Sequence, residues 1–352
     1  MFSELTQNNP SSPLPAGHPP VRAPKIGVLL INLGTPEATD YWSMRRYLSE
    51  FLSDRRVVEV PQAIWQPILQ GIILTFRPRK SGHAYAGIWN RELNESPLKT
   101  FTRAQAEGLR AALHGGPAGS VLVEWGMRYG QPSTAAGIDS LIAKGCERIL
   151  LFPLYPQYSA TTTATACDQA FRHLMTLRRQ PAIRTVPTYH DDPAYIDALA
   201  AGVTRHLDSL SWKPDRIIAS FHGLPKMYLD KGDPYHCYCL KTARLLRERL
   251  GMDADRLTHA FQSRFGRTEW LQPYLEPMVK ALPEQGVKKL AILAPAFVSD
   301  CVETLEEVNQ GIRETFLTAG GTDFTYIPCL NEHPDHINLL RAIVERELAG
   351  WL

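Results

Sequence analysis

The stretch most informative about the fold is residues 216–239, RIIASFHGLPKMYLDKGDPYHCYC. Its apolar opening, residues 216–221, is typical of a buried strand, and His222 stands where that strand ends. Gly223 and Pro225 then favour a turn. Ligands bind at the carboxyl ends of strands in parallel α/β sheets, and a histidine placed there can exchange a proton near neutral pH. His222 is therefore a candidate acid–base residue, and a packed histidine that donates to a backbone carbonyl is the alternative.

Strand-like apolar runs alternate with helical patterns along the rest of the chain. Besides 216–221, the strand-like runs lie at residues 25–33, 120–126, 149–155, 184–188, 259–263, 288–295 and 326–330. This alternation predicts parallel sheets with helices on both faces. Eight strands fit two doubly wound halves better than one sheet. The first run ends in Gly34 without a G-x-G-x-x-G motif, which argues against a dinucleotide site.

The expected boundary between the two halves lies near residues 186–192, which gives domains 25–188 and 189–352. A closing helix is predicted at 335–349, and we expect it to pack back on the first half. The first 24 residues are rich in Pro, Ser and Asn, so they predict a disordered lead rather than a signal or transit peptide.

Composition narrows the class of protein. The 352 residues suffice for two domains, and 38 Lys and Arg against 36 Asp and Glu give no bulk charge for nucleic-acid binding. No apolar run reaches the roughly 18 residues that span a bilayer. Six scattered cysteines do not form a disulfide framework, so we expect a cytoplasmic protein.

Residues 61–80, PQAIWQPILQGIILTFRPRK, are unusually apolar. The apolar positions recur at helical spacing and are Ile64, Trp65, Ile68, Leu69, Ile72, Ile73 and Phe76. Arg77, Arg79 and Lys80 follow at once. One interpretation is a core helix whose basic end suits the helix dipole. The other is an apolar lip with cationic flanks, suited to a flat apolar ligand that carries carboxylates or to a membrane surface.

Residues 294–314, APAFVSDCVETLEEVNQGIRE, place an acidic helix after a strand end. Ser299 or Asp300 is expected to cap that helix. On an α-helix Glu303, Glu307 and Glu314 would share one stripe.

Two interpretations of these acids remain open. A solvated acidic face is preferred for Glu306 and Glu314. For Asp300, Glu303 and Glu307, the position after a strand end favours proton transfer or the passage of a divalent cation.

Cys237 and Cys239 have metal-like neighbours in HCYC, residues 236–239. C-x-C supplies only two ligands, whereas a structural zinc or iron–sulfur site needs four. Cys301 and Cys329 would complete such a site only by approaching in space. Free thiols are therefore the prediction, and an iron–sulfur cluster is not expected.

A set of short motifs follows in order from about residue 25 onward. They are NLGTPE (32–37), SPL (96–98), MRY (127–129), YPQYS (155–159), SFHGLP (220–225), GDPY (232–235), FQSRFG (261–266) and SDCVETL (299–305). This ordered set, which covers nearly the whole chain, resembles the bacterial-type ferrochelatases, enzymes that insert ferrous iron into a porphyrin to complete haem. The resemblance implies two Rossmann-like doubly wound domains, the chelatase fold, with the active-site cleft between them.

The resemblance also implies roles for individual residues. His222 and Glu303 match the active-site histidine and glutamate, which also meet the substrate iron. Asp300 and Glu307 match an acidic row beyond them, expected to relay protons or metal. The positions that match porphyrin-binding residues are Leu33, Arg77, Tyr85, Ser96, Arg128, Tyr129 and Trp270. Within that set Arg77, Tyr85 and Ser96 match residues that hold the propionates, and Arg128 and Tyr129 match the metal side.

Three positions refine the expectation. Leu33 is apolar where enzymes acting on coproporphyrin have Tyr, which favours protoporphyrin IX. Cys301 stands where many relatives have His. Ala160 stands where cluster-bearing animal enzymes have Cys, which argues against a cluster. No cofactor is expected to be required, and Fe²⁺ enters as a substrate.

The expected chemistry follows from proton balance. Metallation releases two pyrrole protons, so neutral His222 is the candidate base, Glu303 its partner, and Asp300 and Glu307 the relay. The alternatives are a non-catalytic tetrapyrrole- or metal-binding protein, or a chelatase for another pair, such as cobalt with a sirohydrochlorin-type ring. Peripheral contact with the inner membrane face through residues 61–80 is a separate expectation.

Overall fold

Eight strands in two parallel sheets form the framework of the computed structural model, which describes residues 17, 25–114, 118, 120–266 and 268–352. The strands in these residues are β1 (Lys25–Gly34), β2 (Leu122–Tyr129), β3 (Cys146–Pro153), β4 (Ala182–Thr185), β5 (Arg216–His222), β6 (Leu257–Gln262), β7 (Lys289–Leu293) and β8 (Asp323–Ile327). Apart from Gly17, the predicted lead 1–24 lies outside the described residues.

The two sheets have the same strand order. The order is β2-β1-β3-β4 in one and β6-β5-β7-β8 in the other, and neighbouring strands pair in parallel throughout the described residues. Counted within its own half, each sheet is therefore 2-1-3-4. The order reverses between strands 1 and 3, where the carboxyl ends open a crevice in doubly wound folds. The predicted fold of two doubly wound halves is confirmed.

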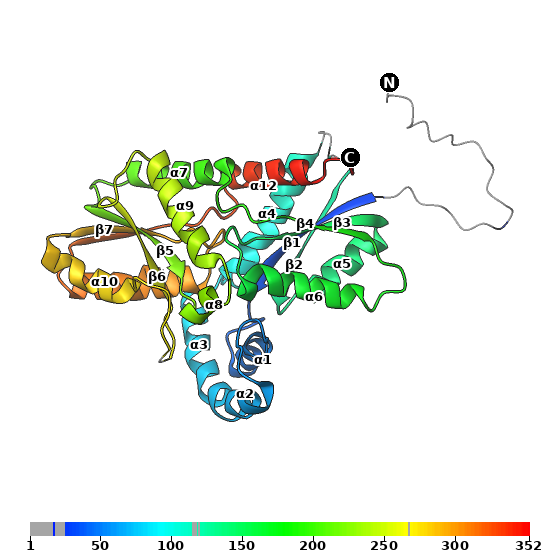
Figure 1. Cartoon of the computed structure of the whole chain (residues 1–352), viewed down its shortest axis with the longest axis horizontal. Helices are drawn as coiled ribbons and strands as arrows, with labels where there is room; N and C mark the ends of the chain where they lie inside the picture. Colours follow the sequence, from blue (N-terminus) through cyan, green and yellow to red (C-terminus); the bar gives the residue numbers. More distant parts are fainter. Residues whose placement is uncertain (1–16, 18–24, 115–117, 119, 267) are drawn as a thin grey trace, which may run out of the picture.

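Helices cover both faces of each sheet (Figure 1). In the described residues they are α1 (Tyr41–Leu52), α2 (Gln62–Ile68), η1 (Leu69–Ile73), α3 (Leu74–Ile88), α4 (Pro97–Leu113), α5 (Thr134–Ala143), η2 (Ala160–Ala164), α6 (Thr165–Leu174), α7 (Pro193–Asp208), α8 (Lys226–Asp230), α9 (Tyr235–Arg249), α10 (Leu275–Ala281), η3 (Leu282–Gln285), η4 (Glu303–Ile312), α11 (Arg313–Thr318) and α12 (Pro334–Glu347). Of these, η1, η2 and η4 are π-helices and η3 is a 3₁₀-helix.

The central strands are continuous apolar runs because both of their faces are buried. Along β1, Val28 and Leu30 enter one apolar cluster, while Leu29 and Ile31 enter another on the opposite face. The cluster of Val28 also contains Phe221 of β5, so one apolar core spans both halves.

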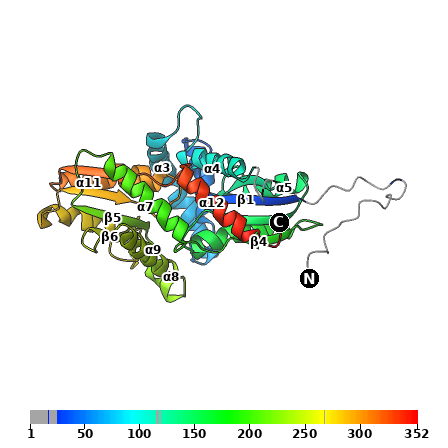
Figure 2. The same cartoon turned by 90° about the horizontal axis from the view of Figure 1, so that it is seen from above.

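The last helix connects the two halves. Helix α12 packs against α4 of the first half and α7 of the second, and both views show it alongside them (Figures 1 and 2). At the end of α12, the guanidinium of Arg184 from β4 donates to the carbonyls of Glu347 and Ala349, at 2.8 and 3.0 Å, and lies 4.3 Å from the centre of the Trp351 ring.

The apolar stretch 61–80 is not one helix. It begins as α2, passes through η1, and continues in α3 to Ile88. Leu69 and Leu74 are buried against α1, but a second row of apolar side chains is exposed. The exposed row is Ile64 (58%), Ile68 (39%), Ile72 (59%) and Phe76 (72%). A core helix does not account for this row, so that alternative is wrong. Within the described residues, no helix is long and apolar enough to cross a membrane.

Candidate active site

The site is organised around His222 at the carboxyl end of β5. The ring nitrogen Nδ1 lies 2.7 Å from the carbonyl oxygen of Gly223. A carbonyl only accepts, so Nδ1 carries a proton, and in the neutral form of the ring the lone pair is on Nε2. The backbone contact expected for a packed histidine is therefore present. The same contact leaves the other nitrogen of this half-buried ring, Nε2, available to accept a proton.

Strand β6 ties this strand end to the acidic helix. The Ser220 hydroxyl donates to the Gln262 amide oxygen at 2.6 Å, and the Gln262 amide donates to the Glu303 carbonyl at 2.9 Å. Both Ser220 and Gln262 are buried. Because these bonds join β5, β6 and the start of η4, His222 and Glu303 belong to one rigid edge. Sequence reasoning missed the role of Gln262, although it lies within the FQSRFG motif.

Glu303 faces the first half of the molecule. Helix α3 packs against η4, and the Glu303 charge acts on Arg77, Tyr47 and Tyr85. Burial lowers the pKa of Arg77, and Glu303 opposes that shift. Burial, together with the nearby Glu303 carboxylate, holds the pKa of Tyr85 well above its usual value. Tyr47 was not among the predicted site residues, because its neighbours Tyr85 and Glu303 come from distant elements.

Glu307 is the second carboxylate of this edge. Its Oε2 accepts a hydrogen bond of 2.6 Å from the Ser263 hydroxyl. Burial raises the pKa of Glu307, Ser263 and His222 act against that shift, and Glu303 and Glu306 add to it. Ser263 has a φ of 65°, a left-handed conformation that is uncommon for a residue other than glycine. The structure therefore brings His222, Glu303 and Glu307 into one electrostatic group.

The acidic helix differs from the α-helix that was predicted. Residues Glu303–Ile312 form a π-helix, and Glu314 lies in α11, where it is exposed. Hydrogen bonds that close five residues back widen each turn, so a spacing of four no longer marks a single face. The expected common stripe of Glu303, Glu307 and Glu314 is therefore wrong. A local sequence pattern carries no sign of such a distortion.

The predicted cap of this helix is also wrong. Neither Ser299 nor Asp300 accepts a hydrogen bond from the first backbone N–H groups of η4 in the described structure. Ser299 instead accepts from the Gln105 amide at 2.7 Å. Asp300 accepts from Tyr326 at 2.7 Å, Asn331 at 2.7 Å and Thr304 at 2.9 Å. Side-chain donors, most of them from other elements, thus bind Ser299 and Asp300 in place of the first backbone N–H groups of η4.

Asp300 is therefore held as a buried anchor, with 4% of its surface exposed. Its three donors come from β8, from the loop before α12 and from η4. This arrangement orients the segment that precedes Glu303. The role of Asp300 in a proton or metal relay stays a prediction.

Arg128 and Tyr129 belong to a buried polar network at the end of β2. Arg128 pairs with Asp54, and its Nε donates to the Thr165 hydroxyl at 2.6 Å. The Tyr129 hydroxyl donates to Asp54 at 2.9 Å. The side chains of Arg128 and Asp54 are only 6% and 5% exposed. Asp54 was missed from the sequence because the pair joins residues 74 positions apart.

The remaining candidate residues occupy different environments. Tyr85 is buried on α3, where its ring meets the edges of Tyr47 and Trp89. Ser96 is buried and caps α4 by accepting from the Lys99 N–H at 3.3 Å.

Leu33 and Trp270 are partly buried, and Trp270 packs over the loop that follows His222. A side chain at Gly223 would come within 3.2 Å of the Trp270 ring and 2.7 Å of the Gln262 carbonyl, so glycine permits this close approach.

Metal-ligating side chains do not gather into a resident metal site. Among the described residues, no group of three or more His, Cys, Asp or Glu side chains is arranged to hold a metal ion. On α9, Cys237 is exposed and Cys239 is buried. Burial and the Glu303 charge hold the pKa of Cys301 well above its usual value, so this thiol stays protonated.

Comparisons with known proteins identify the family. The ferrochelatase family model matches residues 25–348. A ferrochelatase of Agrobacterium fabrum is 59% identical over 97% of this chain and 98% of its own length. The chain belongs to the ferrochelatase family. A ferrochelatase of Rhizobium meliloti is 58% identical over 95% of this chain and 98% of its own length.

Solved structures show the same fold at low sequence identity. SirB from Bacillus subtilis with Fe³⁺ has a TM-score of 0.54 at 12% identity and covers 92% of this chain and 95% of its own. A sirohydrochlorin chelatase SirB of Bacillus subtilis subspecies spizizenii, in complex with cobalt, has a TM-score of 0.53 at 12% identity, with coverages of 92% and 96%. The ferrochelatase-family chain thus has the chelatase fold, as its sequence predicts.

The Asp54–Arg128 pair generates a stability prediction. We expect Asp54→Asn to lower the free energy of unfolding by about 3–5 kcal/mol, because it leaves the Arg128 charge buried without its partner. Asp168→Asn is the matched control, since Asp168 pairs with the exposed Arg56 at 2.9 Å and should cost less than about 1 kcal/mol. Urea denaturation measures both changes. Equal losses in the two variants would contradict the prediction.

The environment of Glu307 generates a pH prediction. Burial raises its pKa in the folded state, so folding loses free energy as pH rises above the unfolded carboxyl pKa of about 4.3. Glu307→Gln removes this cost and keeps an acceptor for Ser263. We therefore expect the variant to be more stable than the wild type near neutral pH, with the gain disappearing below about pH 4.

Urea midpoints near neutral pH and below about pH 4 measure the gain in stability of Glu307→Gln. Glu314→Gln is the exposed control, and little change in stability is expected for it at either pH. A gain for Glu307→Gln that is larger in acid would contradict the assignment.

Proposed function

We propose that this chain inserts Fe²⁺ into protoporphyrin IX and releases two protons, with His222 as the base. The observation that carries the assignment of the base is the contact of Nδ1 with the Gly223 carbonyl, which leaves Nε2 free to accept a proton. Membership of the ferrochelatase family supports the reaction itself. The proposal needs no resident cofactor, because iron is a substrate.

Proton balance assigns the roles at the edge of the second sheet. Each pyrrole N–H that gives way to a metal–nitrogen bond loses one proton, and His222 Nε2 takes it. The carboxylates of Glu303 and Glu307 favour the imidazolium that forms. Because burial raises its pKa, Glu307 is the carboxylate better suited to hold a proton on its way out. Asp300 remains the proposed next member of this path.

Arg77 is the proposed anchor for a propionate. Arg77 is half-buried and forms no ion pair among the described residues, and its guanidinium lies 5.3 Å from the centroid of the Phe265 ring. A half-buried cation without a carboxylate in an ion pair is suited to a ligand carboxylate. Tyr85 and Ser96 are proposed to assist it, with Arg128, Tyr129 and Trp270 lining the rest of the cleft. An apolar Leu33 supports protoporphyrin IX over a ring that carries more carboxylates.

The exposed apolar row on α2, η1 and α3 supports peripheral contact with a membrane at the inner face. Ile64, Ile68, Ile72 and Phe76 are large apolar side chains left in water, and exposed Arg79 and Lys80 follow them. Apolar residues beside basic ones are the combination that binds anionic bilayer surfaces.

The assay of His222 tests the proposed reaction. We expect His222→Ala to slow metalloporphyrin formation by a factor of about 10²–10⁴, because it removes the general base. Absorbance follows the reaction of protoporphyrin IX with Zn²⁺, or with Fe²⁺ under anaerobic conditions. His114→Ala, at an exposed position after α4, should keep wild-type activity.

Turnover no faster than the uncatalysed reaction in the wild type would overturn the proposal. Tight porphyrin binding without insertion would instead identify a tetrapyrrole-binding protein. Preference for cobalt and a sirohydrochlorin-type ring would identify a different chelatase.

Membrane contact has a separate test. Ile68→Glu together with Ile72→Glu should remove most binding to anionic liposomes, because two charges replace the centre of the exposed apolar row. Met175→Glu is the control, since Met175 is 79% exposed but lies just after α6. Sedimentation with liposomes measures the bound fraction. Unchanged binding of the double variant would assign the row to another role.

A further inference from the structure

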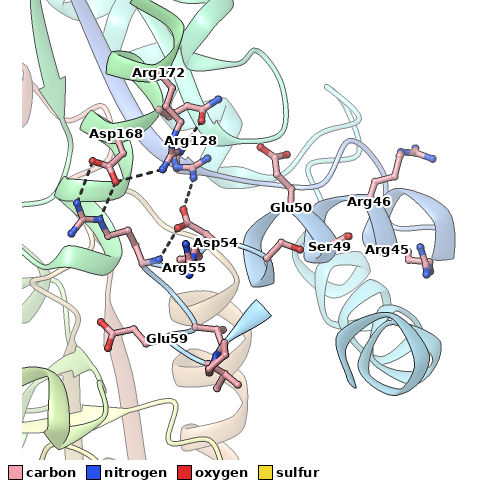
Figure 3. Close-up of a pocket in the computed structure, with 16 residues that line it drawn as sticks. Arg45, Arg46, Ser49, Glu50, Asp54, Arg55, Glu59, Arg128, Asp168 and Arg172 are labelled. Atoms are coloured by element: carbon pink, nitrogen blue, oxygen red, sulfur yellow. Dashed lines mark hydrogen bonds and ion pairs between the residues drawn. The ribbon is translucent and has the colours of Figure 1, made fainter. Parts of the chain in front are cut away.

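A broad groove lies in the first half, between α1, the segment that follows it and α6 (Figure 3). Its volume is about 1200 Å³. It is lined by six arginines, Arg45, Arg46, Arg55, Arg56, Arg128 and Arg172, and by four carboxylates, Glu50, Asp54, Glu59 and Asp168. Six positive charges against four negative ones leave an excess of two. Apart from Arg128, no arginine of this lining has a functional role described above.

The carboxylates of the groove are mostly engaged. Asp54 pairs with Arg128. Asp168 pairs with Arg56 at 2.9 Å and with Arg172 at 3.6 Å. Figure 3 shows Asp54 and Arg128 pointing toward one another.

The two glutamates are also committed. Glu59 pairs with Lys231 of the second half, outside the groove, and Glu50 accepts the Gly130 N–H at 3.0 Å. The carboxylates of Asp54 and Asp168 therefore pair with Arg128, Arg56 and Arg172, whereas neither glutamate pairs with an arginine of the groove in the described residues.

Three arginines of the groove form no ion pair in the part of the chain that the structure describes. Among the described residues, no ion pair involves Arg45, Arg46 or Arg55. Arg45 donates to the Gln70 side chain and Arg46 to the Ser43 hydroxyl, each at 3.0 Å. A guanidinium has five N–H donors, so most of these donors stay available.

Two serines add hydroxyl donors along the same wall. Ser49 Oγ accepts from the Gln70 amide and Ser53 Oγ from the Gln66 amide, each at 3.1 Å. Since each hydroxyl oxygen already accepts from a glutamine, its own proton is free to point into the groove. The wall thus presents guanidinium forks and O–H groups together, and Glu50, next to Ser49 in the sequence, adds a carboxylate to it.

We propose that this arginine groove binds a phosphate-bearing anion. Guanidinium forks match phosphate oxygens in pairs, and hydroxyl donors complete a shell around a tetrahedral group better than around a flat carboxylate. The site is distinct from the cleft, although Arg128 connects the two. Its guanidinium lines the groove and lies 4.2 Å from the centre of the Tyr129 ring.

The phosphate has two possible sources, a soluble phosphate compound or a phospholipid headgroup. Val58, Val60 and Pro61 line the groove and lead directly into α2, which carries the first part of the exposed apolar row. A headgroup in the groove would therefore place its acyl chains beside apolar side chains.

The experiment compares two double variants with the same loss of charge. Arg45→Gln with Arg55→Gln removes two free groove arginines, and Arg244→Gln with Arg341→Gln removes two exposed arginines from α9 and α12. Calorimetry with inorganic pyrophosphate at low salt tests the soluble source. Flotation with phosphatidylglycerol vesicles, against phosphatidylcholine vesicles, tests the lipid source. Porphyrin metallation by both variants, measured in parallel, reports whether the fold is intact.

The expected result is binding of at least one probe by the wild type and the control variant, and binding at least about tenfold weaker by the groove variant. Loss of pyrophosphate binding identifies a soluble phosphate, and selective loss of phosphatidylglycerol binding identifies a headgroup. Failure of the wild type to bind either probe, or equal weakening in the two double variants, would overturn the proposal. Neither result depends on the assignment of His222.

Discussion

The parallel pairing of β5 with β6 on one side and β7 on the other is the constraint on which the site depends. It places the ends of β5 and β6 side by side, with His222 directly opposite Gln262 in the register. The acidic helix η4 follows β7 and returns to the same edge. Once the strands are in register, two hydrogen bonds of the Gln262 amide join Ser220, two residues before His222, to the backbone of Glu303.

This edge combines several features that lower the stability of the fold. Ser263 holds a left-handed backbone conformation, Glu307 is withdrawn from water, and the helix that carries both glutamates is a π-helix. Each feature is unfavourable in isolation. They persist because the surrounding elements are fully packed and because Asp300 is held by three donors. Strain collected at one place in an otherwise regular fold is characteristic of functional sites.

The first half supplies the opposite wall and the basic groups. Arg77, Tyr47 and Tyr85 lie within reach of the Glu303 charge, while Asp54 binds Arg128 and Tyr129 at the end of β2. The shared apolar core and α12 fix the two halves against each other. The arginine groove is lined by the same Asp54–Arg128 pair, so this buried ion pair connects the end of β2 with the groove.

The eight strands, their parallel arrangement and the family could all be predicted from the sequence alone. Apolar runs and ordered motifs are local features, and the strand ends they predicted lie within a few residues of those in the structure. His222, Glu303 and Glu307 were found in the same way, because each follows a recognisable strand or helix signal. Only the tertiary structure decided that η4 is a π-helix, that Asp300 is anchored by β8, and that Asp54 and Gln262 hold the site together. These contacts join residues 26 to 74 positions apart, and a pattern within one segment carries no information about its distant partners.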